Sequence, residues 1–517
     1  MTRITVENFN ENYPRIRDAI STCKFIAFDL EFTALYVEDN EKRSLFDSIA
    51  DRYTKHRSTV SQVIPVQVGL SLFKNNVKEG TYTCETFTFY LWPRPFLRQS
   101  RNLTLSASSF QFLCENKFDF NELIYRGLPF LNRQEEKEFL QIMKSDDFFA
   151  ENKVLSAFID VEIKKISIWL NKKDLEDELP LPAINEKYRT NFEMCYCIHK
   201  IIRKYFKNIH TYVKDDVFMV SRKAVDWSLE DETMKSALGF TNIFRLLVQS
   251  KKPLVGHNPY MDLLLLYNTF EAPLPQSYAE FKSSFVALFP SVYDTKKISR
   301  EIKIPDGLRL AALEDYYEFY KDSGGRHLAM RSPFIQQIDR SSFDHFHDAG
   351  WDSYCTGYIF IRMAHILASN TLMQQNRYLT TTEHLAAVAN LKNCINLIRC
   401  SSPHMKLDGP DPKSLRPSLL IAKNKSNRPL DLTKLTSTLD TCGYVEVKPL
   451  SGKKSAIIAV DNHGSARRIL NKYKDSHEVT VKPYSTTWPN NRMIIWGALA
   501  TSTGFLMALL FRETLRK

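Results

Sequence analysis

The chain has 517 residues, and its 70 Lys and Arg outnumber its 59 Asp and Glu, which gives a formal net charge of +11. This length suits two or three domains, and the positive charge favours a polyanionic partner or an anionic membrane surface. Nine cysteines, without a C-x-x-C pair, argue against a disulfide framework or a zinc site and favour a reducing compartment. Because Met1 to Ile20 contains Arg, Asn and Glu throughout, we expect no secretory signal.

The first motif stands at the end of a predicted buried strand. Phe25 to Phe28 is apolar, and Asp29 and Glu31 follow at alternate positions, so both carboxylates project to the same side. They repel each other unless a cation lies between them, and Mg²⁺ takes oxygen ligands of this kind. Taken alone, the pair also fits a strand end with two solvated acids.

The second motif follows much later in the chain. A short strand ending in V-G-H-N runs into a turn, and Pro259 opens a helix that carries Asp262. Since Leu263 to Leu266 is apolar on all sides, Asp262 is expected at the edge of a buried helix and needs a partner. A metal would supply one, and the helix dipole is the alternative. His257 and Asn258 are expected to form hydrogen bonds within the turn.

The third motif places His347 five residues before Asp352, with Gly350 between them and a helical pattern after. This spacing predicts a histidine on a loop and an acid in the helix that the loop enters. His345 competes with His347, and Asp348 competes with Asp352. Four carboxylates and one histidine are what a two-metal nuclease uses, the acids as metal ligands and a neutral imidazole as the base. The predicted set is Asp29, Glu31, Asp262 and Asp352 for metal and His347 for the base.

In this order the motifs D-x-E, H-N-x-x-x-D and H-x-x-x-x-D resemble the DEDDh branch of 3′→5′ exonucleases, and specifically the PARN-type deadenylase family, over roughly residues 1–400. The resemblance implies a ribonuclease H-like DEDD exonuclease fold of the α/β class and two divalent cations, Mg²⁺ or Mn²⁺. It also implies that Phe32 contacts the 3′-terminal nucleotide and that Lys296 contacts the RNA backbone. The alternative interpretation, that Lys296 is merely a solvated lysine, remains open.

Residues 146–248 are basic and helical, with the longest helical stretch from Glu186 to His210, and separate the nuclease into parts at 1–145 and 249–400. The family carries a small inserted α/β nucleic-acid-binding domain here, with an R-x-x-x-H signature that this interval lacks. Two interpretations remain open for the basic residues of this helix, a surface that faces RNA or a plain solvated helix face. These residues are Lys200, Arg203, Lys204 and Lys207.

A Ser- and Pro-rich linker at 401–417 precedes a predicted RRM-like α+β domain at 415–486 with the order βαββαβ. RNA-binding versions stack bases on aromatic residues of the central strands. Here the corresponding strand is S-A-I-I-A-V, which has none. We therefore expect a degenerate module that packs, forms a homodimer or holds a partner.

The run from Met493 to Phe511 has no charged residue and is flanked by Arg492 and Arg512. As a helix it reaches roughly 28 Å, near the hydrocarbon thickness of a bilayer. We expect a transmembrane tail anchor with the catalytic body in the cytosol. Its short span and basic end favour the mitochondrial outer membrane over the endoplasmic reticulum membrane.

A PARN-type nuclease with such a tail is similar to the membrane-anchored, PARN-like enzymes that trim piRNA precursors. The resemblance implies a 3′→5′ exoribonuclease that acts on the single-stranded 3′ ends of precursors held by PIWI proteins, releases 5′-mononucleotides and is helped by a Tudor-KH scaffold protein. The residues alone indicate metal-dependent phosphodiester hydrolysis. A membrane-anchored poly(A) deadenylase of mRNA is the alternative; an inactive RNA-binding adaptor is disfavoured by the complete five-residue set.

Overall fold

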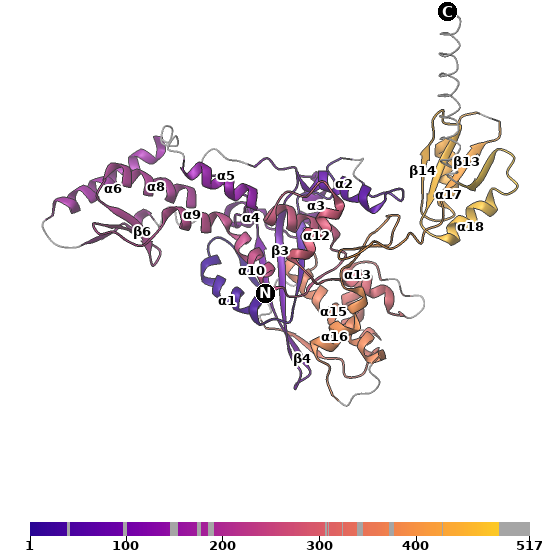
Figure 1. The fold of residues 1–517 in the computed structure, drawn as a ribbon, viewed down its shortest axis with the longest axis horizontal. Helices are drawn as coiled ribbons and strands as arrows, with labels where there is room; N and C mark the ends of the chain where they lie inside the picture. The colour runs from indigo at the N-terminus through magenta and orange to yellow at the C-terminus, as the bar shows by residue number, and fades with distance from the viewer. Residues whose placement is uncertain are drawn as a thin grey trace, which may run out of the picture. The chain divides into compact units, whose positions relative to one another are not determined.

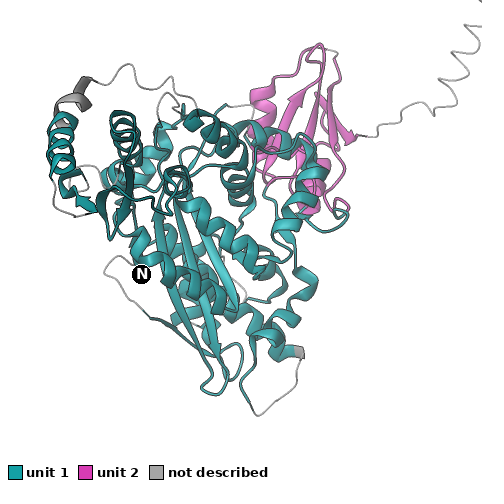
Figure 2. Cartoon of the chain, turned by 60° about the vertical axis from the view of Figure 1, so that its left-hand side comes forward, with its two compact units in different colours: residues 1–42, 49–398, 403–412 teal, residues 43–48, 399–402, 413–517 magenta. Residues whose placement is uncertain are grey.

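The computed structural model describes residues 1–38, 42–96, 101–144, 153–172, 177–184, 191–304, 308, 310–322, 324–338, 345–371, 377–426 and 428–484. The chain divides into two compact units, residues 1–42, 49–398 and 403–412, and residues 43–48, 399–402 and 413–517 (Figure 2). The predicted tail anchor at 493–511 lies outside the described residues. Within them, no helix has both the length and the apolar character that a membrane span requires.

The first unit is built on a seven-stranded sheet made of β1 (Thr2–Ile4), β2 (Phe25–Phe32), β3 (Pro65–Asn76), β4 (Thr81–Tyr90), β8 (Leu254–Gly256), β9 (Val292–Asp294) and β10 (Phe334–Gln337). The strand order is β1-β4-β3-β2-β8-β9, and β10 also pairs with β4. β3 is antiparallel to β2 and β4, whereas β8 and β9 continue the sheet in parallel with β2. Every residue from Pro65 to Phe73 is buried, so β3 is covered on both faces.

One long helix forms much of the core against this sheet. α15 (Ala349–Thr371) lies along β2, β3 and β4, and its Tyr354 and Tyr358 share a core cluster with Phe25 and Phe73. Figure 1 shows α15 beside α16 (Thr381–Ala387). The first unit also contains α1 (Phe9–Thr22), α2 (Ile49–Val60), α3 (Ala107–Glu115), α4 (Phe120–Arg126), α5 (Arg133–Lys144), α9 (Leu229–Leu238), α10 (Phe240–Ser250), α11 (Tyr260–Leu266), α12 (Tyr278–Leu288), α13 (Thr295–Ile298) and α14 (Leu313–Asp322).

The predicted insertion contains a small sheet with the order β5-β7-β6, made of β5 (Glu178–Pro180), β6 (His210–Lys214) and β7 (Val217–Ser221). Helices α6 (Lys153–Asn171) and α8 (Phe192–Tyr205) contribute to one core with these strands. The expectation that a helix continues to His210 is wrong, because α8 ends at Tyr205 and His210 opens β6. The following T-Y-V is β-branched and aromatic, which favours a strand.

The second unit contains β13 (Leu420–Asn424), α17 (Leu432–Asp440), β14 (Val445–Pro449), β15 (Ser455–Val460), α18 (His463–Lys472) and β16 (Val479–Pro483). Its antiparallel sheet has the order β14-β15-β13-β16. One cluster of buried apolar residues joins the two helices to one face of this sheet. The first unit also contains a short antiparallel pair of strands, β11 (Cys394–Asn396) and β12 (His404–Lys406).

Candidate active site

The topology of the main sheet brings the three sequence motifs together. Asp29 and Glu31 lie at the end of β2, and the parallel neighbour β8 leads into α11, which carries Asp262 in its first turn. Asp352 lies in the first turn of α15. Possible ligand atoms of Glu31, His347 and Asp352 lie within 4.8 Å of one another. The first and third motifs therefore converge on one point. Asp29 and Asp262 are not part of this group of three, and Asp262 is linked to it by its electrostatic effect on Asp29 and Glu31.

Two glycines allow α15 to come so close to the sheet. Gly69 of β3 is the cross-strand partner of Asp29, and a Cβ at Gly69 would lie 1.7 Å from the carbonyl oxygen of Ala349. A Cβ at Gly350 would lie 1.9 Å from Oγ1 of Thr88. Any side chain at these positions would push the start of α15, and with it the third motif, away from β2.

Asp348 has a structural role at the start of α15. Its Oδ1 accepts hydrogen bonds from the N–H of Gly350 at 3.0 Å and from the hydroxyl of Thr88 at 3.3 Å. Its Oδ2 accepts one from the side-chain amide of Gln67 at 3.4 Å. Since both carboxylate oxygens serve this helix start, Asp348 is the weaker candidate for a metal ligand.

Asp352 differs in having one oxygen left over. Its Oδ2 accepts a hydrogen bond from the N–H of His347 at 3.0 Å, while its buried Oδ1 receives none from the residues that the structure describes. His347 has φ of 66°, a left-handed conformation that is uncommon for a residue other than glycine. The ring of Phe112 stands edge-on to the His347 ring, with centroids 4.6 Å apart. The Nδ1 atom of the competing His345 instead contacts the carbonyl oxygen of Phe346 at 3.1 Å.

The carboxylates carry the electrostatic signature of a cation site. Burial, followed by repulsion from Asp352 and Asp262, raises the pKa of both Asp29 and Glu31 well above the usual range. Burial also raises the pKa of Asp262 to about 7, although N–H groups including that of Leu30 oppose the shift. It raises the pKa of Asp352 to about 8. Packed acids that resist ionisation gain the most from a divalent cation.

These residues fit a hard divalent cation. The available ligand atoms are carboxylate oxygens. Within the described part of the chain, no hydrogen-bond donor takes the place of such an ion at the buried Oδ1 of Asp352. Desolvation lowers the pKa of His347 below its usual range. Its imidazole is therefore neutral near pH 7, the state in which it can accept a proton.

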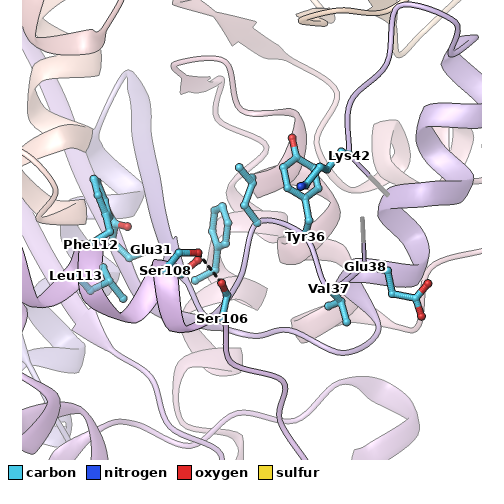
Figure 3. Close-up of a pocket in the computed structure, with 12 residues that line it drawn as sticks. Glu31, Tyr36, Val37, Glu38, Lys42, Ser106, Ser108, Phe112 and Leu113 are labelled. Carbon is cyan, nitrogen blue, oxygen red and sulfur yellow. Dashed lines mark hydrogen bonds between the residues drawn. The ribbon is translucent and has the colours of Figure 1, made fainter. Parts of the chain in front are cut away.

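A cavity of about 590 Å³ opens beside the cluster and is lined by Glu31 and Phe32, a size typical of small-ligand sites. Figure 3 shows Phe112 on one side of Glu31, and Tyr36 on the other. The sequence alone does not indicate Phe112 or Tyr36, since neither belongs to a chemical motif. Lys296 does not line this cavity; its Nζ donates to the carbonyl of Ala311 and lies 4.8 Å from the ring centroid of Tyr316.

The predicted basic face of the insertion is only partly available. Arg203 donates to Oγ1 and the carbonyl oxygen of Thr211 at 2.8 and 2.6 Å, and Lys200 forms an ion pair with Glu230 at 3.3 Å. Lys204 and Lys207 are exposed. Arg203 and Lys200 thus contribute to internal contacts of the first unit.

In the second unit, a segment of the chain's own sequence, residues 43–48, covers part of the sheet face opposite the helices. Glu446 accepts hydrogen bonds from the hydroxyl of Ser44 at 2.5 Å and from the N–H of Leu45 at 3.0 Å. Its cross-strand neighbour Ala459 points away from the helical core and is still only 2% exposed. This part of the sheet offers no open platform for base stacking.

Comparisons with known proteins agree with this geometry. A family model described as CAF1 family ribonuclease matches residues 4–360. The chain is 31% identical to the pre-piRNA 3′-exonuclease trimmer of Bombyx mori, with 99% of this chain and 98% of that protein covered. It is 27% identical to the poly(A)-specific ribonuclease PNLDC1 of Mus musculus, with 98% of each chain covered. It is also 27% identical to the poly(A)-specific ribonuclease PARN of Xenopus laevis, with 92% of this chain and 80% of that protein covered.

Proposed function

The chain belongs to the CAF1 family of ribonucleases and is a 3′→5′ exoribonuclease, and we propose that it trims the 3′ ends of piRNA precursors by a metal-dependent reaction. The observation that carries the metal dependence is the convergence of Glu31, His347 and Asp352 within 4.8 Å. Similarity along almost its whole length to a pre-piRNA 3′-exonuclease supports the substrate.

In this proposal Asp29, Glu31, Asp262 and Asp352 hold two divalent cations, Mg²⁺ or Mn²⁺. Bound cations supply Lewis-acid polarisation of the scissile phosphate and stabilise charge on the leaving oxygen. The neutral imidazole of His347 accepts the proton of the attacking water. The hydrogen bond from the His347 N–H to Asp352 ties the base to the acid set.

The cavity beside Glu31 gives the reaction its direction. It is bordered by Phe32 and Phe112, whose rings can stack on a nucleobase. A terminal nucleotide seated there presents its 5′-phosphate to the carboxylates, so hydrolysis releases 5′-mononucleotides. Lys296 lies on α13, directly after the end of β9, and we assign it to the RNA backbone upstream of the scissile bond.

The proposal also covers where in the cell the reaction takes place and how the substrate is presented. The charge-free run at 493–511 supports a tail anchor, and we place the enzyme on the mitochondrial outer membrane with its body in the cytosol. Precursors are presented there by PIWI proteins with a Tudor-KH scaffold protein. Poly(A) deadenylation is the second candidate function, supported by the likeness to PNLDC1 and PARN.

The test uses the full chain in detergent with 5′-labelled single-stranded RNAs and Mg²⁺. We expect stepwise shortening of mixed-sequence 3′ ends, and no reaction with a 3′-phosphate or a 2′-O-methylated terminus. A strong preference for oligo(A) ends would favour the deadenylase. Cleavage of circular RNA at the same rate would contradict an exonuclease.

A further inference from the structure

A buried carboxylate outside the proposed metal set joins three segments next to the site. Asp294, the last residue of β9, is 0% exposed. Its Oδ1 accepts hydrogen bonds from the N–H of Asn258 at 2.8 Å and of Lys296 at 2.9 Å. Its Oδ2 accepts one from the N–H of Asn396 in β11 at 2.7 Å. The three donors belong to the turn before α11, the start of α13 and a separate strand.

A further bond closes this network into a ring. The side-chain amide of Asn396 donates to Oδ1 of Asn258 at 2.8 Å. Asn258 has φ of 56°, a left-handed conformation that costs free energy and persists only when the surroundings enforce it. Asn258 lies four residues before Asp262, so the conformation of this turn sets where α11 begins and where the Asp262 carboxylate lies.

The extent of the network distinguishes it from an ordinary helix cap. Asp294 does cap α13, but that function needs only the bond to the N–H of Lys296. The bonds to Asn258 and Asn396 add nothing to α13, which is only four residues long. They connect the turn of the second motif to the segment that carries Lys296.

We propose that Asp294 is a positioning residue of the nuclease. Through the three N–H groups that donate to it, Asp294 fixes the positions of the Asp262 carboxylate and of the Lys296 main chain relative to the rest of the metal site. The inference rests on the proposed function, since it assigns Asp262 to metal. Residues that orient metal ligands typically contribute about 10–100-fold to metal affinity or activity, because a displacement of about 1 Å is costly at a reacting centre.

The test variant is Asp294→Asn, which keeps the volume and one acceptor oxygen. Its new NH₂ group meets the N–H of Asn396, so two donors oppose each other where one hydrogen bond stood. We expect Mn²⁺ binding to the full chain, measured by electron paramagnetic resonance, to weaken about 10–100-fold. The half-saturating Mg²⁺ concentration for hydrolysis should rise in parallel, and excess Mn²⁺ should partly restore kcat.

The matched control is Asp411→Asn. Asp411 also accepts a backbone hydrogen bond, from Lys406 at 2.8 Å, and contacts Tyr278 and Lys282 in α12, none of which belongs to the motifs. Both variants are measured well below their Tm and per folded molecule. Wild-type Mn²⁺ affinity in the Asp294 variant, or equal losses in both variants, would overturn the positioning role. If the wild-type chain hydrolyses no RNA, the proposed function fails, while the Mn²⁺ measurement still decides the role of Asp294.

Discussion

Replacing Asp352 by Asn should stabilise the metal-free protein and abolish hydrolysis in the presence of Mg²⁺. In the metal-free fold, burial raises the pKa of Asp352 from 3.8 to about 8. At pH 7 the unfolded chain ionises this carboxyl, whereas the folded chain keeps it protonated, which costs the fold about 4 kcal/mol at about 1.36 kcal/mol per pH unit. Asparagine avoids this cost, and its carbonyl oxygen can still accept the N–H of His347.

We therefore expect Asp352→Asn to stabilise the metal-free protein by about 2–4 kcal/mol at pH 7, a rise in Tm of a few degrees. Because the folded pKa is raised, the wild-type carboxyl supports folding below pH 3.8, and this support is lost as the pH approaches 8. The difference in free energy of unfolding between variant and wild type should increase over that pH interval and then stay constant.

The assay is thermal unfolding in EDTA at several pH values, followed by hydrolysis in Mg²⁺. The variant should be inactive, and Mg²⁺ should raise the Tm of the wild type only, since a ligand stabilises the state that binds it. A variant less stable than wild type at pH 8 would refute the burial argument. Turnover within about tenfold of wild type would refute the metal assignment.

Three further predictions address the base, the anchor and the second unit. His347→Ala should lower kcat by roughly 10²–10⁴-fold without loss of Mn²⁺ binding, and His345→Ala should lower kcat less. The reverse order in kinetic assays would show that His347 is not the base. Removing Arg492 to Lys517 should leave hydrolysis of naked RNA intact and release the enzyme from membranes in cell fractionation, whereas continued membrane attachment would contradict the tail anchor. Glu446→Ala should increase hydrogen–deuterium exchange at Leu45, because the hydrogen bond from the Leu45 N–H to Glu446 is lost; unchanged exchange there would contradict the docking of residues 43–48.

The sequence predicts the local geometry of the motifs because each lies on one element. Alternation puts Asp29 and Glu31 on one side of a strand, which is observed as β2. Pro259 precedes the helix that carries Asp262, and Gly350 lies in the first turn of the helix that carries Asp352. Their roles in metal binding stay predictions until a variant is measured.

Contacts between segments that are far apart in the chain leave no pattern of residue spacing in the sequence. Among the described residues, Asp294 accepts its hydrogen bonds from backbone N–H groups, which every residue except proline offers, so the sequence does not reveal its partners. The close approach at Gly69 depends on a helix far along the chain. The bond from Ser44 to Glu446 joins residues 402 positions apart, and a degenerate RRM-like pattern does not predict which segment covers its sheet.

The site has an order of assembly that follows from its energetics. Without a cation, burial and then the neighbouring acids oppose ionisation of these carboxyls, which costs the fold free energy at neutral pH. The contacts that hold them in place are of another kind: the packing at Gly69 and Gly350, and N–H bonds to Asp348 and Asp294. None of these needs metal. The carboxyl groups are therefore positioned before a cation binds, so binding has little conformational entropy left to oppose it. The cation acts mainly by favouring the ionised form of the buried acids.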